Sequence, residues 1–386
     1  MSRNPRQRRA RGRSRVGERH EAVVGPVAHG GHCVVRVPAG DASDPEATRV
    51  VFTRHALPGE RVVVQITEGT DGDRFWRGDA VEILEASADR VAAPCPFAGP
   101  GLCGGCDFQH VALPRQRALK ADVVREQLVR LGRLPPDDPL VSDLVVERVP
   151  GDDDGLRWRT RGRFVELGEG RRGMRRFRSR DVIEVDDCLI HRPGGSEHTV
   201  HGVAFDVAPG GFWQVHPGAP QVLVDTVLAM LDPRPGESVL DLYAGVGLFA
   251  RFLAERVGPD ARVVLVEGDA EAARRAARNV AGAKVRTRAG DVGTVLAHDF
   301  DEPFDLVVLD PPREGAKRAV VEQVVDRAPR AIAYVACDPA ALARDIALFA
   351  EHGYDVQELR AFDLFPMTHH VECVALLTKS GSRLRS

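Results

Sequence analysis

The sequence has no apolar run approaching the ~20 residues that a membrane-spanning helix requires. The Arg-rich N-terminal stretch also lacks the apolar segment of a signal peptide. We therefore expect a cytoplasmic protein without membrane attachment. The length of 386 residues predicts two or three domains with a sizeable core.

A strong excess of one charge is also missing, because the formal net charge is only −3. Lysine is scarce, with four residues, so almost all the basic charge is arginine. Residues 1–20 contain eight Arg and one Glu, and residues 157–180 contain ten Arg and two Glu. Two basic blocks in a nearly neutral chain predict contacts with a polyanion such as RNA. The alternative is a solvated tail and an ordinary charged hairpin in an Arg-rich proteome.

Cysteine is present but does not suggest disulfides, since the chain is expected in a reducing compartment. The count of seven is odd, and three of the cysteines lie at short spacing, at Cys95, Cys103 and Cys106. Such clustering predicts a metal or cluster site, with the other cysteines left for catalysis or packing.

The chain divides by pattern into four parts. Residues 1–20 are predicted to be a basic disordered tail. Residues 21–86 read as short strands between turns, which is typical of a small β-barrel of the kind that often binds oligonucleotides. Residues 87–205 form a central α+β domain that begins with the cysteines and contains a predicted helix over 115–131. Residues 206–386 alternate strands with helices, which predicts an α/β domain with a parallel sheet.

A glycine-rich turn, Asp241-Leu-Tyr-Ala-Gly-Val-Gly, follows the first strand of the α/β domain and opens a helix. Glycine there allows a ligand to approach the backbone. Glu267 ends the next strand, where a carboxylate can accept hydrogen bonds from both hydroxyls of a ribose. The pattern fits NAD, FAD and S-adenosylmethionine. The turn lacks the third glycine of the dinucleotide-binding pattern, which favours S-adenosylmethionine. S-adenosylmethionine has no pyrophosphate and therefore does not need a phosphate-binding turn.

Two further carboxylates follow strands of this domain. Asp291 lies where an adenine would bind, although a helix N-cap explains it equally well. Asp310 begins Asp-Pro-Pro-Arg at the carboxyl edge of the sheet, where open α/β sheets bind ligands. The alternative for Asp310 is a turn cap.

Cys337 lies where a strand gives way to a helix, whose N-terminus can favour a thiolate. A small buried residue is the alternative. Glu372 interrupts an apolar strand and is a candidate general base, or else a surface charge at a sheet edge.

Five segments in this order resemble the uracil-5 RNA methyltransferase family. They are Gly211-Phe-Trp-Gln214-Val, the turn from Asp241, Asp310-Pro-Pro-Arg-x-Gly, Ala-Cys337-Asp-Pro and Phe365-Pro-x-Thr-x-His-x-Glu372. The resemblance covers residues 25–380. It implies a Rossmann-like methyltransferase sheet, an N-terminal TRAM or OB-like RNA-binding barrel, and a central iron–sulfur domain.

The resemblance also implies roles. Cys337 stands at the position of the family's nucleophile and Glu372 at that of its general base. The positions that bind S-adenosylmethionine or shape its site correspond to Gln214, Tyr243, Glu267, Asp291 and Asp310. The implied reaction is addition of the thiolate to C6 of uracil, methylation at C5 and removal of the C5 proton.

Cys95, Cys103, Cys106 and Cys188 occur in an order that resembles the family's 4Fe–4S pattern, with a tetrahedral zinc site as the alternative. The expected substrate is a uridine in ribosomal or transfer RNA. Two alternatives stay open, namely methylation of cytidine C5 or another RNA base, and RNA binding without turnover. No obligate protein partner is evident, and a monomer is expected.

Overall fold

The computed structural model describes residues 12–39, 47–195, 197–280 and 284–381. Residues 1–11 of the predicted basic tail lie outside these ranges, and within 12–20 the first strand already begins at Arg19. The chain forms two compact units. The first comprises residues 1–119, 163–189 and 367–369, and the second comprises 120–162, 190–366 and 370–386. Within the described ranges, none of the helices is long and apolar enough to span a bilayer.

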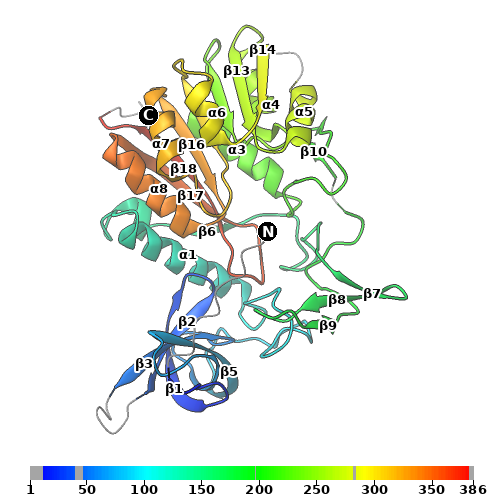
Figure 1. Ribbon diagram of the computed structural model, residues 1–386, viewed down its shortest axis with the longest axis vertical. Coiled ribbons are helices and arrows are strands. Elements are labelled where there is room, and N and C mark those ends of the chain that lie inside the picture. Colours follow the sequence, from blue (N-terminus) through cyan, green and yellow to red (C-terminus); the bar gives the residue numbers. More distant parts are fainter. Residues whose placement is uncertain (1–11, 40–46, 196, 281–283, 382–386) are drawn as a thin grey trace. The chain divides into compact units, whose positions relative to one another are not determined.

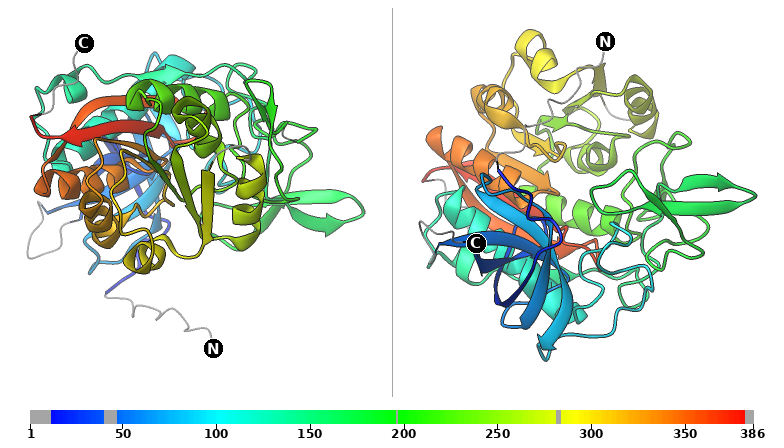
Figure 2. Two further views of the ribbon diagram at one scale, coloured as in Figure 1. Left: turned by 90° about the horizontal axis from the view of Figure 1, so that it is seen from above. Right: turned by 60° about the horizontal axis from the view of Figure 1, so that its bottom comes forward.

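The first unit contains a closed barrel, drawn in blue in Figure 2. Its five strands have the order β1-β2-β3-β5-β4. The strands are β1 (Arg19–Ala28), β2 (His32–Pro38), β3 (Thr48–Arg54), β4 (Arg61–Glu68) and β5 (Phe75–Glu85). Alternate residues point inward, and the interior is filled by branched aliphatic side chains such as Val35, Val51 and Ile66. Closure pairs every strand on both sides, so the barrel has no exposed edge. The predicted small barrel is confirmed, although β1 did not stand out because polar residues fill its first half.

A three-stranded antiparallel sheet also belongs to the first unit. It consists of β7 (Val165–Gly168), β8 (Arg171–Arg175) and β9 (Val182–Glu184). Residues 163–180 of the second basic block belong to the same unit. Six of its arginines are exposed, namely Arg163, Arg171, Arg175, Arg176, Arg178 and Arg180.

The second unit is built on an eight-stranded sheet in the order β14-β13-β12-β15-β16-β18-β17-β6 (Figure 1). Its strands are β6 (Val146–Arg148), β12 (Val239–Leu242), β13 (Arg262–Glu267), β14 (Lys284–Ala289), β15 (Leu306–Leu309), β16 (Ala331–Ala336), β17 (Tyr354–Asp363) and β18 (Glu372–Lys379). The five strands from β14 to β16 run parallel. Short buried strands such as Val239–Leu242 read as continuous apolar runs because both faces of the sheet are covered.

Helices cover both faces of this sheet (Figure 1). One core joins the sheet to α3 (Ala219–Leu231), α4 (Leu248–Val257) and α5 (Ala270–Asn279). The opposite core contains α6 (Val292–His298), α7 (Lys317–Asp326), α8 (Pro339–Glu351) and the later part of α1 (Leu113–Arg130). The predicted methyltransferase-like α/β fold is confirmed in this arrangement. The predicted domain boundaries at residues 86 and 205 stay a prediction.

One feature of the sheet differs from the expected parallel arrangement. The strand β18 lies between β16 and β17 and is antiparallel to both. The sequence did not predict β17, because charged residues interrupt its apolar pattern. The insertion of β18 matters for the site, because it brings residues near the C-terminus beside the end of β16.

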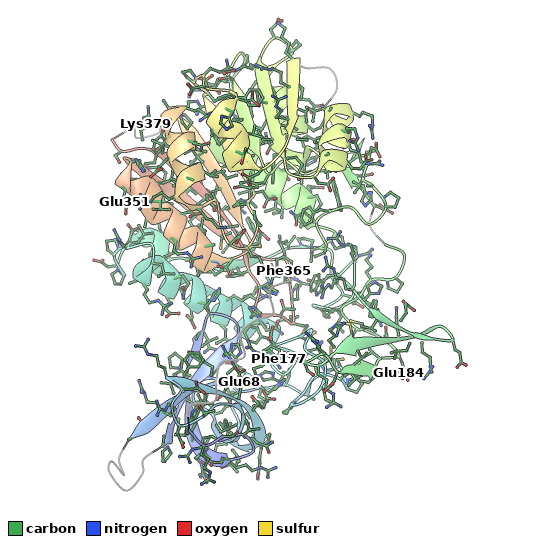
Figure 3. The ribbon with its side chains drawn as sticks, viewed as in Figure 1. Glu68, Phe177, Glu184, Glu351, Phe365 and Lys379 are labelled. Carbon is green, nitrogen blue, oxygen red and sulfur yellow. The ribbon has the colours of Figure 1, made fainter. Side chains whose placement is uncertain are left out.

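A buried ion pair holds the end of β17. The Nζ atom of Lys120 donates to Oδ1 of Asp363 at 2.6 Å and to the carbonyl oxygen of Phe365 at 3.0 Å. The side chains of Lys120 and Asp363 are 0% and 3% exposed. Phe365, labelled in Figure 3, lies in the loop that leads from β17 towards β18. Lys120 therefore fixes both the strand end and the start of this loop.

Replacement of Lys120 by methionine is expected to lower the free energy of unfolding by about 3–5 kcal/mol, because Asp363 would remain buried without its cation. Urea unfolding measures the change. Lys284→Met is the matched control, since Lys284 makes an exposed ion pair with Asp260 and should cost less than about 1 kcal/mol. Equal losses in the two variants would contradict a stabilising role for the buried pair.

Candidate functional site

Strand register brings Cys337 and Glu372 together in the second unit. Ala336, the last residue of β16, pairs with Cys373 of β18 in an antiparallel ladder. Continuing that ladder by one residue sets Cys337 opposite Glu372, the first residue of β18. Cys337 is partly exposed, whereas Glu372 is 3% exposed. A thiol that solvent can reach therefore has a buried carboxyl group as its neighbour.

Charges around this pair disfavour both ionised forms. Burial raises the pKa of Cys337 to about 12, and the negative charges of Glu372 and Asp310 add to the rise. Burial, and then the charge of Asp310, raise the pKa of Glu372 well above its usual value. Arg313 opposes both shifts. Burial and the neighbouring carboxylates thus oppose the thiolate of Cys337, which the N-terminus of α8 is expected to favour.

The glycine-rich turn joins β12 to α4 in the second unit. Gly247 is the N-cap of α4 with φ of +84°, and a Cβ atom there would lie 2.9 Å from Cγ2 of Val280. Gly245 has φ of +55° and would place a Cβ atom in open space. Side-chain packing therefore leaves no space beside Gly247. The space beside Gly245 is open, so a ligand can approach the backbone there.

Three carboxyl groups lie at the carboxyl ends of neighbouring strands. Asp241 is fully buried, and its Oδ2 accepts a hydrogen bond from the backbone N–H of Ala250 at 3.0 Å. Its Oδ1 has no hydrogen-bond partner among the described residues. Burial, reinforced by the charges of Asp310 and Glu267, raises the pKa of Asp241 to about 8. Burial and the charge of Glu267 raise the pKa of Asp310 to about 7. This acidic group favours a cationic ligand.

Glu267 has a defined orientation. Its Oε2 accepts from the backbone N–H of Gly245 at 2.8 Å, and its Oε1 accepts from the N–H of Asp269 at 2.7 Å. A carboxylate has about four acceptor positions, so two remain available for hydroxyl donors. These acceptor positions suit the ribose hydroxyls of S-adenosylmethionine, the acidic groups suit its sulfonium charge, and the open glycine turn leaves room for it.

The other three residues predicted to bind the cofactor differ in burial and in their contacts. Tyr243 has φ of +62°, and burial, with the charge of Asp291, raises its pKa to about 12. Asp291 is exposed and caps α6, since its Oδ1 accepts from the backbone N–H and the hydroxyl of Thr294 at 2.9 Å each. These contacts are those of a helix N-cap, which was the alternative role for Asp291. Gln214 is partly exposed and, among the described residues, makes no hydrogen bond to the other residues of this group.

The four cysteines of the predicted cluster all belong to the first unit. Cys95, Cys103 and Cys188 are close enough to Cys106 for each charge to raise its pKa, although burial is the larger cause. The Sγ atom of Cys106 accepts from Nε2 of Gln109, and that of Cys103 accepts from the N–H of Gly105, both at 3.4 Å. In the described ranges, however, no three His, Cys, Asp or Glu side chains converge closely enough to hold a single metal ion. The seven cysteines, all described, form no disulfide.

Two sets of charged residues with specific contacts were not predicted from the sequence. Arg313, in the quoted Asp-Pro-Pro-Arg segment, lowers the pKa of both Cys337 and Glu372, and its Nη2 lies 3.4 Å from Nε2 of His370. A cation three residues after Asp310 was the available signal. In the first unit, Asp107 contacts His369, and no motif marked either residue.

Comparisons with known proteins agree with this description. The family described as tRNA (Uracil-5-)-methyltransferase matches residues 293–380, and a methyltransferase small domain matches residues 219–334. The TRAM domain matches residues 13–81, which cover most of the barrel. A tRNA (uracil-54, C5)-methyltransferase from Pyrococcus abyssi, solved with S-adenosyl-L-homocysteine, has the same fold, with a TM-score of 0.66 and 20% identity over 93% of this chain and 99% of that chain.

The fold and the site thus define an S-adenosylmethionine-dependent methyltransferase. An uncharacterized RNA methyltransferase of Streptomyces avermitilis is 43% identical over 96% of this chain and all of the relative. The 23S rRNA (uracil(1939)-C(5))-methyltransferase RlmD of Chromohalobacter salexigens is 31% identical over 93% of this chain and 89% of the relative. The chain belongs to the family of uracil-C5 RNA methyltransferases.

The charge arrangement around Cys337 gives a testable expectation for its reactivity. Because the pKa of its thiol is about 12, alkylation should accelerate with pH up to at least pH 9, following the thiolate fraction. Asp310→Asn should speed alkylation at pH 8 by about two- to tenfold and Arg313→Gln should slow it similarly, since each removes one neighbouring charge. Mass spectrometry of the Cys337 peptide separates this thiol from the other six. A rate that levels off near neutral pH would disprove the arrangement.

Proposed function

We propose that the protein methylates C5 of a uridine in RNA, with Cys337 as nucleophile and Glu372 as general base. The observation that carries this proposal is the position of a solvent-accessible thiol opposite a buried carboxyl group, at the end of β16 and the start of β18. The thiol of Cys337 can attack the uracil ring, and the carboxyl group of Glu372 can receive a proton from the same ring.

The thiolate of Cys337 adds to C6 of the uracil, and the electron pair of the C5–C6 double bond moves into an enolate. This converts C5 into a carbon nucleophile. S-adenosylmethionine, when bound, supplies the electrophilic methyl group. Glu372 then removes the proton from C5, the double bond re-forms, and the thiolate of Cys337 leaves. The raised pKa makes the carboxylate of Glu372, once ionised, a stronger proton acceptor.

The cofactor would be held at the glycine turn. Glu267 offers two acceptor positions to the ribose hydroxyls, and Gly245 leaves room for close approach. The acidic groups of Asp241 and Asp310 favour the positive sulfonium charge. Tyr243, Asp291 and Gln214 are assigned to the same site by the resemblance.

The substrate proposed is a uridine in large-subunit ribosomal RNA. The support is the 31% identical relative from Chromohalobacter salexigens, which is named for a 23S rRNA uracil. Exposed arginines of the β7–β9 sheet and the barrel provide surfaces for RNA contact. Mapping of 5-methyluridine in RNA from cells lacking the protein identifies the nucleotide, and nucleoside analysis separates uridine from cytidine methylation.

The four cysteines are proposed to hold a 4Fe–4S cluster in the first unit. The donor set of four thiols fits such a group, and the hydrogen bonds from Gln109 and Gly105 to sulfur are of the kind that adjust cluster potentials. A 4Fe–4S cluster holds its thiolates farther apart than one zinc ion does. This suits the four cysteines, whose charges influence the pKa of Cys106 although, in the described ranges, no three ligands are close enough for one metal ion. The cluster would link two segments of the first unit. One follows β5 and carries Cys95, Cys103 and Cys106, and the other follows β9 and carries Cys188.

Substitution of the two proposed catalytic residues should separate the steps. Cys337→Ala should form no denaturant-stable complex with 5-fluorouridine RNA, because the attacking sulfur is absent. Glu372→Gln should form that complex, and should also accumulate a stable complex with ordinary uridine RNA, since proton removal slows by about 10²–10⁴-fold. Gel electrophoresis under denaturing conditions measures both complexes.

Cys373→Ala is the control for thiol loss, because Cys373 is fully buried beside the pair and should leave complex formation intact. Stable complex formation by Cys337→Ala would remove the proposed mechanism.

The cluster proposal predicts a brown protein with absorbance near ~400 nm after anaerobic purification. Cys188→Ser should reduce that absorbance and the iron content, because one of four ligands is lost. Cys33→Ser is the control, because Cys33 lies in β2 and is not one of the four proposed ligands. Its thiol donates a hydrogen bond to the carbonyl oxygen of Ala56. A colourless protein with stoichiometric zinc would refute the cluster.

A further inference from the structure

The loop of residues 310–316 joins β15 to α7 in the second unit and carries both Asp310 and Arg313. It is held where it begins, because the backbone N–H of Asp310 donates to the carbonyl oxygen of Leu242 at 3.3 Å. Asp310 therefore keeps its place at the edge of the sheet. The position of Arg313, three residues further along, depends on how the other end of the loop is bound.

The other end is bound by the side chain of Asp345, a buried residue of α8. Its Oδ2 accepts from the backbone N–H of Ala316 at 2.7 Å and from that of Lys317 at 3.3 Å. Ala316 is the N-cap residue of α7 and has no side-chain oxygen for these donors. A carboxyl group of α8 therefore caps the N-terminus of α7, which lies on the same face of the sheet (Figure 1).

Tyr334 of β16 takes part in the same contact. Its buried hydroxyl donates to Oδ2 of Asp345 at 2.6 Å and accepts from the backbone N–H of Ala316 at 3.1 Å. Tyr334 precedes Cys337 by three residues, and Asp345 follows Cys337 by eight. The strand that leads to Cys337 and the helix that leads away from it therefore both bind the end of the loop that carries Arg313.

The backbone connects this contact directly with Arg313. The N–H of Gly315 donates to the carbonyl oxygen of Pro312 at 2.8 Å, so Arg313 lies inside a hydrogen-bonded turn of four residues. A Cβ atom at Gly315 would lie only 2.6 Å from Oδ2 of Asp345, so the last residue of the turn packs against the carboxyl group. Lys317 has φ of +68°, a left-handed conformation that non-glycine residues rarely adopt and that surrounding contacts must maintain.

Arg313 in turn acts on the proposed catalytic pair. Its charge lowers the pKa of both Cys337 and Glu372. Its Nη2 lies 3.4 Å from Nε2 of His370, which precedes Glu372 by two residues. Burial and, after it, the charges of three carboxylates raise the pKa of Cys337, namely Glu372, Asp310 and Asp338. Arg313 is the one cation among these groups, so its distance from the thiol determines how far the thiolate is stabilised.

We propose that Asp345 is a positioning residue, which holds the turn of residues 312–315 so that the guanidinium group of Arg313 stays beside Cys337 and Glu372. Its relevance to catalysis rests on the function proposed above for that pair. The contact itself is independent of the reaction, because it consists of hydrogen bonds between α8, β16 and the start of α7.

Loss of the Asp345 carboxyl group should separate the two ends of the loop in their effect. The end at Asp310 remains bound to Leu242 of β12, so its negative charge stays near Cys337. The turn with Arg313 loses its contact with α8, and the cation spends less time beside the thiol. The thiolate is then less stable, and its addition to C6 of a uracil becomes slower.

Alkylation of Cys337 by two reagents tests this role in the full-length protein. Iodoacetamide is neutral and iodoacetate is an anion, and the thiolate fraction affects both rates equally. The ratio of the iodoacetate rate to the iodoacetamide rate therefore reports the electrostatic potential beside the thiol. A general loosening of the site would raise both rates together and leave the ratio nearly unchanged. Mass spectrometry of the Cys337 peptide gives the two rates.

Asp345→Ala is expected to lower this ratio about two- to tenfold at pH 8 and low salt, and Arg313→Gln should lower it similarly, because each removes the cation from the thiol. Loss of the Asp345 charge alone would raise the ratio, so a fall identifies the displaced arginine. The double variant should show no further fall, since Asp345 acts through Arg313. Asp345→Asn keeps one acceptor oxygen and should lie between the wild type and Asp345→Ala.

Asp305→Asn is the matched control. The Oδ2 atom of Asp305 also accepts two hydrogen bonds, from the backbone N–H and the hydroxyl of Ser238 at 2.7 Å each. Asp305 directly precedes β15 and so lies at the opposite end of that strand from Asp310. This variant should leave the ratio unchanged even where urea unfolding shows that the protein is less stable.

Two results would overturn the proposal. One is an unchanged or higher ratio in Asp345→Ala, and the other is a fall of the same size when Asp345→Ala is added to Arg313→Gln, because Asp345 would then act by another route. If Asp345→Ala does not fold, Tyr334→Phe is judged on the same criteria, since it removes only the hydroxyl from this contact.

The same variants relate the ratio to the reaction. Asp345→Ala and Arg313→Gln should slow formation of the denaturant-stable complex with 5-fluorouridine RNA by similar factors. If the wild type forms no such complex, the proposed function fails, whereas the alkylation ratios still decide whether Asp345 positions Arg313.

Discussion

The pairing of β16 with an antiparallel β18 is the constraint on which the site depends. In a sheet built only from parallel strands, the residue after β16 would have neighbours from the carboxyl ends of other strands alone. Insertion of β18 sets the first residue of that strand, Glu372, beside Cys337. The ladder extends over six residue pairs in the core of the sheet, so the relation between thiol and carboxyl group is fixed by backbone hydrogen bonds.

The same edge of the sheet concentrates negative charge. Asp241 lies in β12, Glu267 ends β13 and Asp310 follows β15. The charges of Asp310 and Glu267 raise the pKa of Asp241, and the charge of Glu267 raises the pKa of Asp310. Burial of like charges is unfavourable for stability, and it is relieved when protons or a cation bind. Asp310 also raises the pKa of Cys337 and Glu372, so it connects the proposed cofactor residues with the proposed catalytic pair. Arrival of a positive group near Asp310 should therefore ease ionisation at both.

Much of this arrangement could be predicted from the sequence. The alternation of strands and helices could be predicted because buried parallel strands such as Ala331–Ala336 and Arg262–Glu267 are mostly continuous apolar runs. The glycine turn and the residues after the strands followed from the same pattern. The direction of β18 and the existence of β17 could not be predicted, because strand order depends on tertiary packing and β17 has a mixed pattern. The burial of Cys337 and the approach of Asp310, which raise the pKa of its thiol, could not be predicted either, because they arise from tertiary packing. Contacts such as Asp107 with His369 join residues 262 positions apart and leave no local signal.

The most direct test of the account is to identify the residue that carries the RNA in a complex trapped with 5-fluorouridine. Proteolysis and mass spectrometry of that complex should yield a modified nucleotide on the peptide containing Cys337 and on no other peptide. Attachment to a different residue, such as Cys373 or one of the four clustered cysteines, would contradict the central role assigned to the end of β16.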